Sequence, residues 1–116
     1  MRILTPLFVS KYFGKILNIH PSLLPKFPGL NTHQKAIDAN EKKHGVSVHF
    51  VTEEIDGGPI ISQESVNIEA KDTAKTLSDK VLKKEYVIFP KVIHWYTQRR
   101  LKLINNITVT LDGKII

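Results

Sequence analysis

Hydrophobic residues recur along this chain with two different periods. Short apolar runs bounded by proline, glycine or polar residues predict buried strands at 16–20, 46–51 and 60–68. In the run at 46–51, valine and phenylalanine alternate with serine and histidine, so this strand should be buried mainly on one face. The residues 21–31 contain three prolines and a glycine, which predicts a shaped loop instead of a regular element.

Helical spacing appears in two segments. Thr32 can cap a short helix at about 33–40. A longer apolar pattern starts at Asp72 or Thr73 and continues to Tyr96, with hydrophobic residues three and four positions apart.

The end of this long pattern carries a helix breaker and then a hairpin. Pro90 has no backbone N–H, so we expect a kink or a break near 87–89. Beyond it, strands at 101–105 and 108–111 should form a small terminal hairpin. We therefore predict one α/β domain over 1–116: a mainly parallel sheet with flanking helices, a long kinked helix and a hairpin.

The composition narrows the classes of protein. The 116 residues include no cysteine, which excludes disulfides, thiolate catalysis and cysteine metal sites and suits a reducing compartment. The apolar run 3–9 is interrupted by Pro6 and followed by Lys11, so we interpret it as ordered structure and not as a secretory signal. We expect a soluble, cytoplasmic protein without a membrane partner.

The net charge of +6 favours anionic partners such as phosphorylated metabolites or nucleic acid. The lysines of the segment 71–84 are interspersed with acidic residues, however, which is typical of a solvated helix face. Nucleic-acid binding would need a basic stripe with stacking aromatics, so it is the weakest of the alternatives.

Two polar residues mark the end of the first predicted strand. Asn18 and His20 are two positions apart and should face the same side of the sheet. An asparagine amide can donate a hydrogen bond to a carbonyl oxygen that becomes an oxyanion, and a histidine can donate or accept a proton near neutral pH. This pair suits the transfer of an acyl-type group without a metal.

A carboxylate, Asp56, lies on the later loop next to Gly57 and Gly58. Close to His20, it would raise the pKa of the imidazole and could hold a water that relays protons. Taken singly, Asn-x-His at a strand end is also typical of a satisfied polar pair, and Asp-Gly is typical of a turn. Both interpretations stay open at this point.

The remaining histidines do not predict a metal site. His33, His44 and His49, taken with His20, match no compact ligand spacing. We interpret His49 as a hydrogen-bonded residue behind the site. Glu85, beside two lysines, is by itself typical of a solvated salt-bridging residue.

Longer motifs surround these residues. The chain contains NIHPSLLPKFPGLNTH at 18–33, HGVSVHFV at 44–51 and EIDGGPII at 54–61, followed by Gln63. These motifs resemble the formyltransferase family over essentially the whole chain. Within that family, Pro21 and the segment 27–33 favour the purine-synthesis members over the members that formylate methionyl-tRNA or hydrolyse the formyl donor.

The resemblance implies formyl transfer from 10-formyltetrahydrofolate, a cosubstrate, to the amine of 5-phosphoribosylglycinamide in de novo purine biosynthesis, without a metal. It implies that Asn18 binds the formyl oxygen and that His20 donates a proton. Asp56 would raise the pKa of that histidine and organise the relay water. It also suggests a cis Leu24–Pro25 peptide.

The same resemblance implies two binding regions. The folate would be held by Met1, Arg2, Ile3, Leu4, Asn18, Thr52, Glu53, Glu54, Ile55 and Asp56. The ribose of the nucleotide would be approached by Leu82, Lys83, Lys84 and Glu85.

Family members carry an N-terminal half with a phosphate-gripping loop, and no such loop precedes the first strand here. We therefore expect a C-terminal folate-binding and catalytic part, truncated at its N-terminus, with an exposed sheet edge that joins the missing half or associates with itself. Alternatives that stay open are hydrolysis of formyltetrahydrofolate, formylation of another amine, and a non-catalytic folate-binding module.

Overall fold

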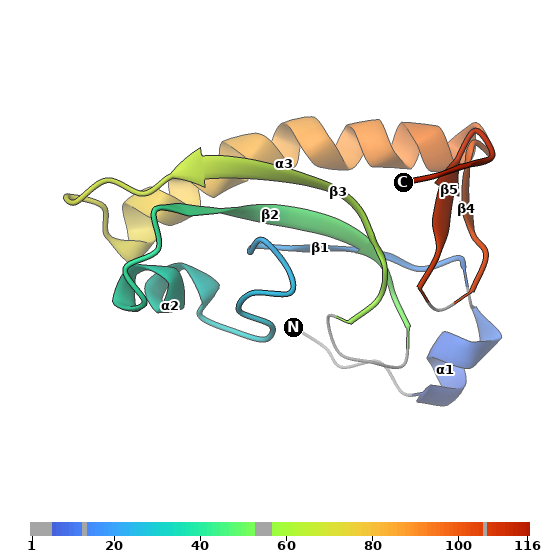
Figure 1. Ribbon diagram of the computed structural model, residues 1–116, viewed down its shortest axis with the longest axis horizontal. Helices are drawn as coiled ribbons and strands as arrows, with labels where there is room; N and C mark the ends of the chain where they lie inside the picture. The colour runs from blue at the N-terminus through green and yellow to red at the C-terminus, as the bar shows by residue number, and fades with distance from the viewer. Residues whose placement is uncertain (1–5, 13, 53–56, 106) are drawn as a thin grey trace.

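A three-stranded sheet forms the middle of the molecule, with one long helix on one face and a loop on the other (Figure 1). The computed structural model describes residues 6–12, 14–52, 57–105 and 107–116. The sheet contains β1 (Leu17–His20), β2 (Lys43–Phe50) and β3 (Ile60–Asn67), with β2 between the other two. The long helix is α3 (Ala74–Thr97).

Both strand pairs of this sheet are antiparallel. The mainly parallel sheet that we predicted is therefore wrong for the described strands. A parallel pair needs a crossover of about a dozen residues or more, and only residues 51–59 separate β2 from β3. Residues 21–42 between β1 and β2 include α2 (Thr32–Asp38) and are long enough for a crossover, so the length of that connection does not decide the direction of the pair. His20 at the end of β1 pairs with Ser47, so β2 enters the sheet from the end at which β1 leaves it.

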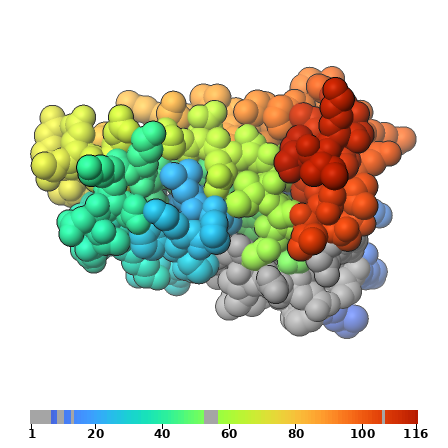
Figure 2. Space-filling view, in the orientation of Figure 1, coloured from blue at the N-terminus to red at the C-terminus, as the bar shows by residue number. Residues whose placement is uncertain are grey.

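A second sheet lies at one end of the molecule, opposite the yellow turn between β3 and α3 (Figure 2). It contains β4 (Leu101–Leu103), β5 (Val109–Leu111) and β6 (Lys114–Ile115), each antiparallel to its neighbour. Asp112 and Gly113 both have positive φ, 54° and 82°, as a two-residue hairpin turn of type I′ requires.

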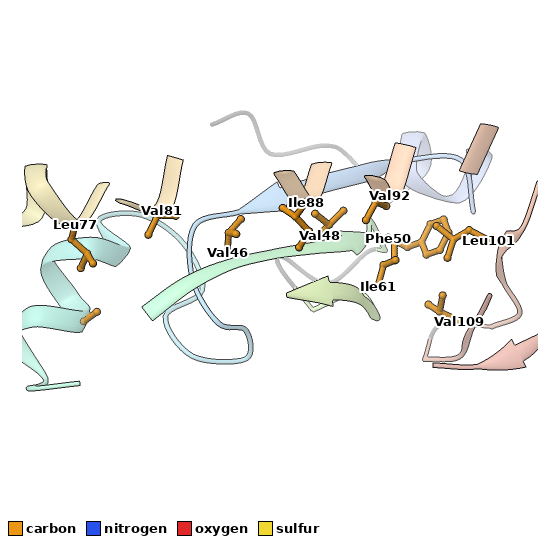
Figure 3. Close-up of a cluster of buried hydrophobic side chains, with 11 residues drawn as sticks. Val46, Val48, Phe50, Ile61, Leu77, Val81, Ile88, Val92, Leu101 and Val109 are labelled. Carbon is orange, nitrogen blue, oxygen red and sulfur yellow. The ribbon is translucent and has the colours of Figure 1, made fainter. Parts of the chain in front are cut away.

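The hydrophobic core lies between α3 and the sheet. Because successive strand residues alternate in direction, Val46, Val48 and Phe50 of β2 all face α3. Figure 3 shows Ile88 and Val92 of α3 directed toward β2. The buried cluster consists of Ala36, Val46, Val48, Phe50, Ile61, Leu77, Val81, Ile88, Val92, Leu101 and Val109.

The long helix begins with a complete capping box, in which the Thr73 side chain accepts from the Thr76 N–H and the Thr76 side chain accepts from the Thr73 N–H. It continues through Pro90, so the expected break is not found. Pro90 and Tyr86 are both exposed, and water can therefore satisfy the Tyr86 carbonyl that lacks a helical donor. The kink stays a prediction.

Near its start the chain forms a short helix, α1 (Pro6–Lys11), which overlaps the apolar run 3–9 that we expected to be ordered. Residues 1–5 lie outside the described part. In the segments that the structure describes, no helix is long and apolar enough to cross a membrane.

Candidate active site

Asn18 and His20 lie on the face of the sheet opposite α3, as their spacing predicts. Their register partners on β2 are His49 and Ser47, whereas Ile19 between them pairs with Val48 of the core face. Asn18 is partly exposed and His20 is buried. The pair thus combines an accessible amide with an enclosed imidazole.

The imidazole of His20 is oriented by the loop that follows β1. Its Nε2 lies 2.9 Å from the carbonyl oxygen of Phe27. A carbonyl oxygen only accepts, so Nε2 carries the proton and donates this hydrogen bond. The loop conformation therefore contributes to the ring orientation of His20.

The loop has an unusual backbone over residues 21–31. The Leu24–Pro25 bond is cis, as the resemblance suggested, and Phe27, Gly29 and Asn31 have positive φ. Thr32 does not cap α2 as predicted: it is the first helical residue, and its hydroxyl donates to the carbonyl of Pro21. The threonine thus closes the loop on itself instead of satisfying the helix N-terminus.

Ser47 and Gln63 attach this loop to the sheet. The sequence alone suggested no role for either side chain. The Ser47 hydroxyl donates to the Ser22 carbonyl at 2.7 Å and accepts from the Leu24 N–H at 3.1 Å. Gln63 Nε2 donates to the Leu24 carbonyl at 3.0 Å and to the Ser47 hydroxyl at 2.9 Å. A serine between two valines of a buried strand was the signal that could have revealed the attachment.

A histidine pair lies beside the loop. His33 Nδ1 and His44 Nε2 are 3.1 Å apart. Burial, followed by the nearby His33 and His20, lowers the pKa of His44 to about 4, and burial also lowers the pKa of His33. Within the described residues, no three histidine, aspartate or glutamate side chains are grouped so that they could hold a metal ion.

His49 is buried opposite Asn18 and donates through Nδ1 to the carbonyl of Phe50 at 2.9 Å. This is the hydrogen-bonded histidine behind the site that the strand pattern predicted.

Several predicted site residues lie outside the described part of the chain, namely Asp56, Met1, Arg2, Ile3, Leu4, Glu53, Glu54 and Ile55. Thr52 follows β2 and lies beside Gly58. A Cβ on Gly58 would come within 1.8 Å of the Phe50 carbonyl oxygen. Gly58 is therefore required by the backbone of the chain itself.

Leu82, Lys83, Lys84 and Glu85 lie on α3, and the structure does not bring them together with Asn18 and His20, which face away from that helix. Glu85 is half-buried, and this burial raises its pKa. It shares a helical stripe with Val81 and Ile88 of the core, so it is less solvated than the sequence suggested.

The chain is similar to known proteins over its whole length. The phosphoribosylglycinamide formyltransferase of Haemophilus influenzae is 51% identical over 116 residues, which are 100% of this chain and 54% of that protein. The solved structure of the phosphoribosylglycinamide formyltransferase of Coxiella burnetii superposes with a TM-score of 0.94 at 50% identity, over 100% of this chain and 54% of the other.

A formyltetrahydrofolate deformylase from Pseudomonas syringae is a more distant structural relative, with a TM-score of 0.88 and 29% identity over 96% of this chain and 37% of that one. The chain spans about half the length of the phosphoribosylglycinamide formyltransferases that it matches. The family model described as "Formyl transferase" matches residues 1–93. With its motifs, its fold and this match in agreement, the chain belongs to the formyl transferase family.

Proposed function

We propose that this chain is the folate-binding and catalytic part of an enzyme that formylates the amine of 5-phosphoribosylglycinamide, using 10-formyltetrahydrofolate, in purine biosynthesis. The observation that carries the proposal is the placement of Asn18 and His20 on one face, with the imidazole buried and oriented by Phe27. The strong likeness to phosphoribosylglycinamide formyltransferases supports this choice of substrate.

The proposed reaction forms a bond between the amine nitrogen and the formyl carbon and breaks the bond from that carbon to N10 of the folate. The Asn18 amide donates to the formyl oxygen while this oxygen carries negative charge. His20, as the imidazolium, supplies the proton that the departing N10 requires from the ring nitrogen that does not bind the Phe27 carbonyl. The attacking amine loses a proton to a water held by Asp56, which passes it on to His20 and so restores the imidazolium. Protons therefore balance without a metal.

Under this proposal the folate lies against Asn18, Thr52 and the segments 1–4 and 53–56. The proposed ribose contact, Leu82–Glu85, lies on α3, which covers the face of the sheet opposite Asn18. A nucleotide that contacts both Asn18 and Leu82–Glu85 must therefore extend round an edge of the sheet. The half-buried Glu85 is the carboxylate that best suits a ribose hydroxyl there.

A second polypeptide segment is part of the proposal. Among the described strands, β1 pairs on one side only, which leaves an edge that can accept another strand. On α3, Leu82, Tyr86, Val87 and Ile93 are 39–71% exposed. We propose that this edge and this apolar face are covered by polypeptide equivalent to the part of the longer relatives that the chain does not span, or otherwise by a second copy.

The test is reconstitution. The chain is mixed with the part of the Haemophilus influenzae relative that it does not cover, and formyl transfer from 10-formyltetrahydrofolate to 5-phosphoribosylglycinamide is followed by product formation. We expect transfer by the mixture above either part alone. Binding of a folate analogue in calorimetry without transfer in any mixture would instead support a non-catalytic binding module.

Hydrolysis is the second candidate, because the deformylase of Pseudomonas syringae shares the fold at 29% identity. The same mixture without an amine acceptor distinguishes the two. Release of formate at the rate seen with the acceptor present would favour hydrolysis over transfer.

Sedimentation tests the proposal that another polypeptide covers the β1 edge and the exposed apolar residues of α3. Self-association of the chain alone that increases with concentration, and that is reversed by adding the uncovered part of the Haemophilus influenzae relative, would support it.

A further inference from the structure

We propose that Gln63 is a positioning residue for His20. The hydrogen bonds of Gln63 go to Leu24 and Ser47, and through them Gln63 holds the loop that orients the imidazole. The inference rests on the proposed function only in so far as His20 is the proton donor of that reaction.

The three residues form one row across the sheet. His20 of β1 is the register partner of Ser47 of β2, and Ser47 is the register partner of Gln63 of β3. Directly opposite residues of antiparallel strands point to the same side, so all three side chains meet the loop that crosses this face. The two residues at the ends of the row, His20 and Gln63, therefore both hydrogen-bond to the loop.

At one end of the row, both amide hydrogens of Gln63 are used, one on the Leu24 carbonyl and one on the Ser47 hydroxyl. At the other end, His20 Nε2 donates to the Phe27 carbonyl, three residues further along the loop. Between these points, the Ser22 hydroxyl donates to the Lys26 carbonyl at 2.6 Å and the Lys26 N–H donates to the Leu23 carbonyl at 3.1 Å. The segment 22–27 thus moves as one turn, and displacing Leu24 displaces the acceptor of His20.

Gln63 is suited to this role because it does little else. It is exposed on an edge strand and is absent from the core cluster. Its removal should leave the packing between α3 and the sheet intact while releasing the loop. A purely structural residue would instead affect the whole fold.

The test compares Gln63→Met, which keeps length but removes both donors, with Gln98→Met at the exposed end of α3. Selective ¹⁵N labelling of the five histidines, with His20→Gln for assignment, gives the exchange rate of the His20 Nε2 proton by NMR. In Gln63→Met we expect this rate, and that of the Leu24 amide, to rise about tenfold or more, since two hydrogen bonds are lost. The amide of Val48 in the central strand should exchange as in the parent.

In the reconstituted mixture, Gln63→Met should lower kcat about tenfold while the KM for the folate changes much less, because the loop orients the reacting histidine. Gln98→Met should match the parent in every measurement. Unchanged exchange at His20 and Leu24 in Gln63→Met would overturn the proposal, and so would an equal acceleration at Val48. These exchange rates are measured on the chain alone and therefore decide the proposal even if the parent mixture transfers no formyl group.

Discussion

Ser47 is the register partner of His20 in the sheet, and its hydroxyl hydrogen-bonds to the loop that follows His20. In the same loop, the Phe27 carbonyl accepts a hydrogen bond from the Nε2–H of His20. The Ser47 hydroxyl makes one donated and two accepted hydrogen bonds, which is its full capacity. Both Ser47 and Ser22 are fully buried. The hydrogen bonds of Ser47 to Ser22 and Leu24 are therefore buried.

Ser47→Ala should destabilise the fold. It leaves the buried Leu24 N–H and the Ser22 carbonyl without the hydroxyl, and an unsatisfied buried polar group costs about 1–3 kcal/mol. We expect a loss of that size in the free energy of unfolding, measured by urea denaturation. Ser65→Ala, at an exposed position of β3, is the control and should stay within about 0.5 kcal/mol of the parent. Equal losses in both variants would contradict the attachment.

Asn18→Ala should remove activity without removing the fold. The loss of one donor to a developing oxyanion typically costs a factor of about 10²–10³ in kcat. Because Asn18 is partly exposed, we expect the free energy of unfolding of the Asn18→Ala variant to differ from that of the parent by less than about 1 kcal/mol. The measurements are the kcat of the reconstituted mixture and urea unfolding of the chain. A kcat within about threefold of the parent would exclude Asn18 from the proposed role.

Two neighbouring residues of α3 should respond very differently to truncation. Ile88 is fully buried and Val87 is 61% exposed. Ile88→Ala should lower the free energy of unfolding by about 2–5 kcal/mol, because it removes buried apolar atoms and leaves a cavity. Val87→Ala should change it by no more than about 0.5 kcal/mol. If thermal or urea unfolding ranks the two variants equally, the assignment of the core-facing side of α3 is wrong.

Stability should fall as the pH is lowered from about 6.5 to about 4. The pKa of His44 is about 4 in the fold against 6.5 when exposed, because of burial and then the nearby His33 and His20. Protons therefore bind more tightly to the unfolded chain, so the contribution of His44 is complete above pH 6.5 and is lost on the way down to 4. Its size is on the order of 3 kcal/mol, since one pKa unit corresponds to about 1.4 kcal/mol.

His44→Gln should flatten this pH dependence, with urea unfolding measured at several pH values. The pKa of His33 is also lowered by burial, so a smaller slope of the same sign should persist in the variant. The carboxylate of Glu41 acts in the opposite direction on His44, because it raises the pKa of that histidine. His94→Gln, at an exposed position in the last turn of α3, should leave the parental slope unchanged. A slope that is identical in parent and His44→Gln would contradict the assignment to His44.

Much of the secondary structure follows from local patterns. The apolar runs at 16–20, 46–51 and 60–68 overlap β1, β2 and β3, and the pattern from Thr73 to Tyr96 becomes α3. The same-side placement of Asn18 and His20 follows from strand geometry alone. The role predicted for Thr32, to cap α2, was wrong. Its hydroxyl donates instead to the Pro21 carbonyl, an acceptor that becomes available only when the loop folds back.

By itself the sequence determined most of the elements, the family motifs and the identity of the candidate residues, because these depend on neighbours along the chain. Only the tertiary structure decided the antiparallel order, the row from His20 through Ser47 to Gln63, and the placement of Leu82–Glu85 across the sheet from Asn18. Each of these depends on residues far apart in sequence, paired through strand register and burial. Local periodicity carries no information about which strand pairs with which, or in which direction.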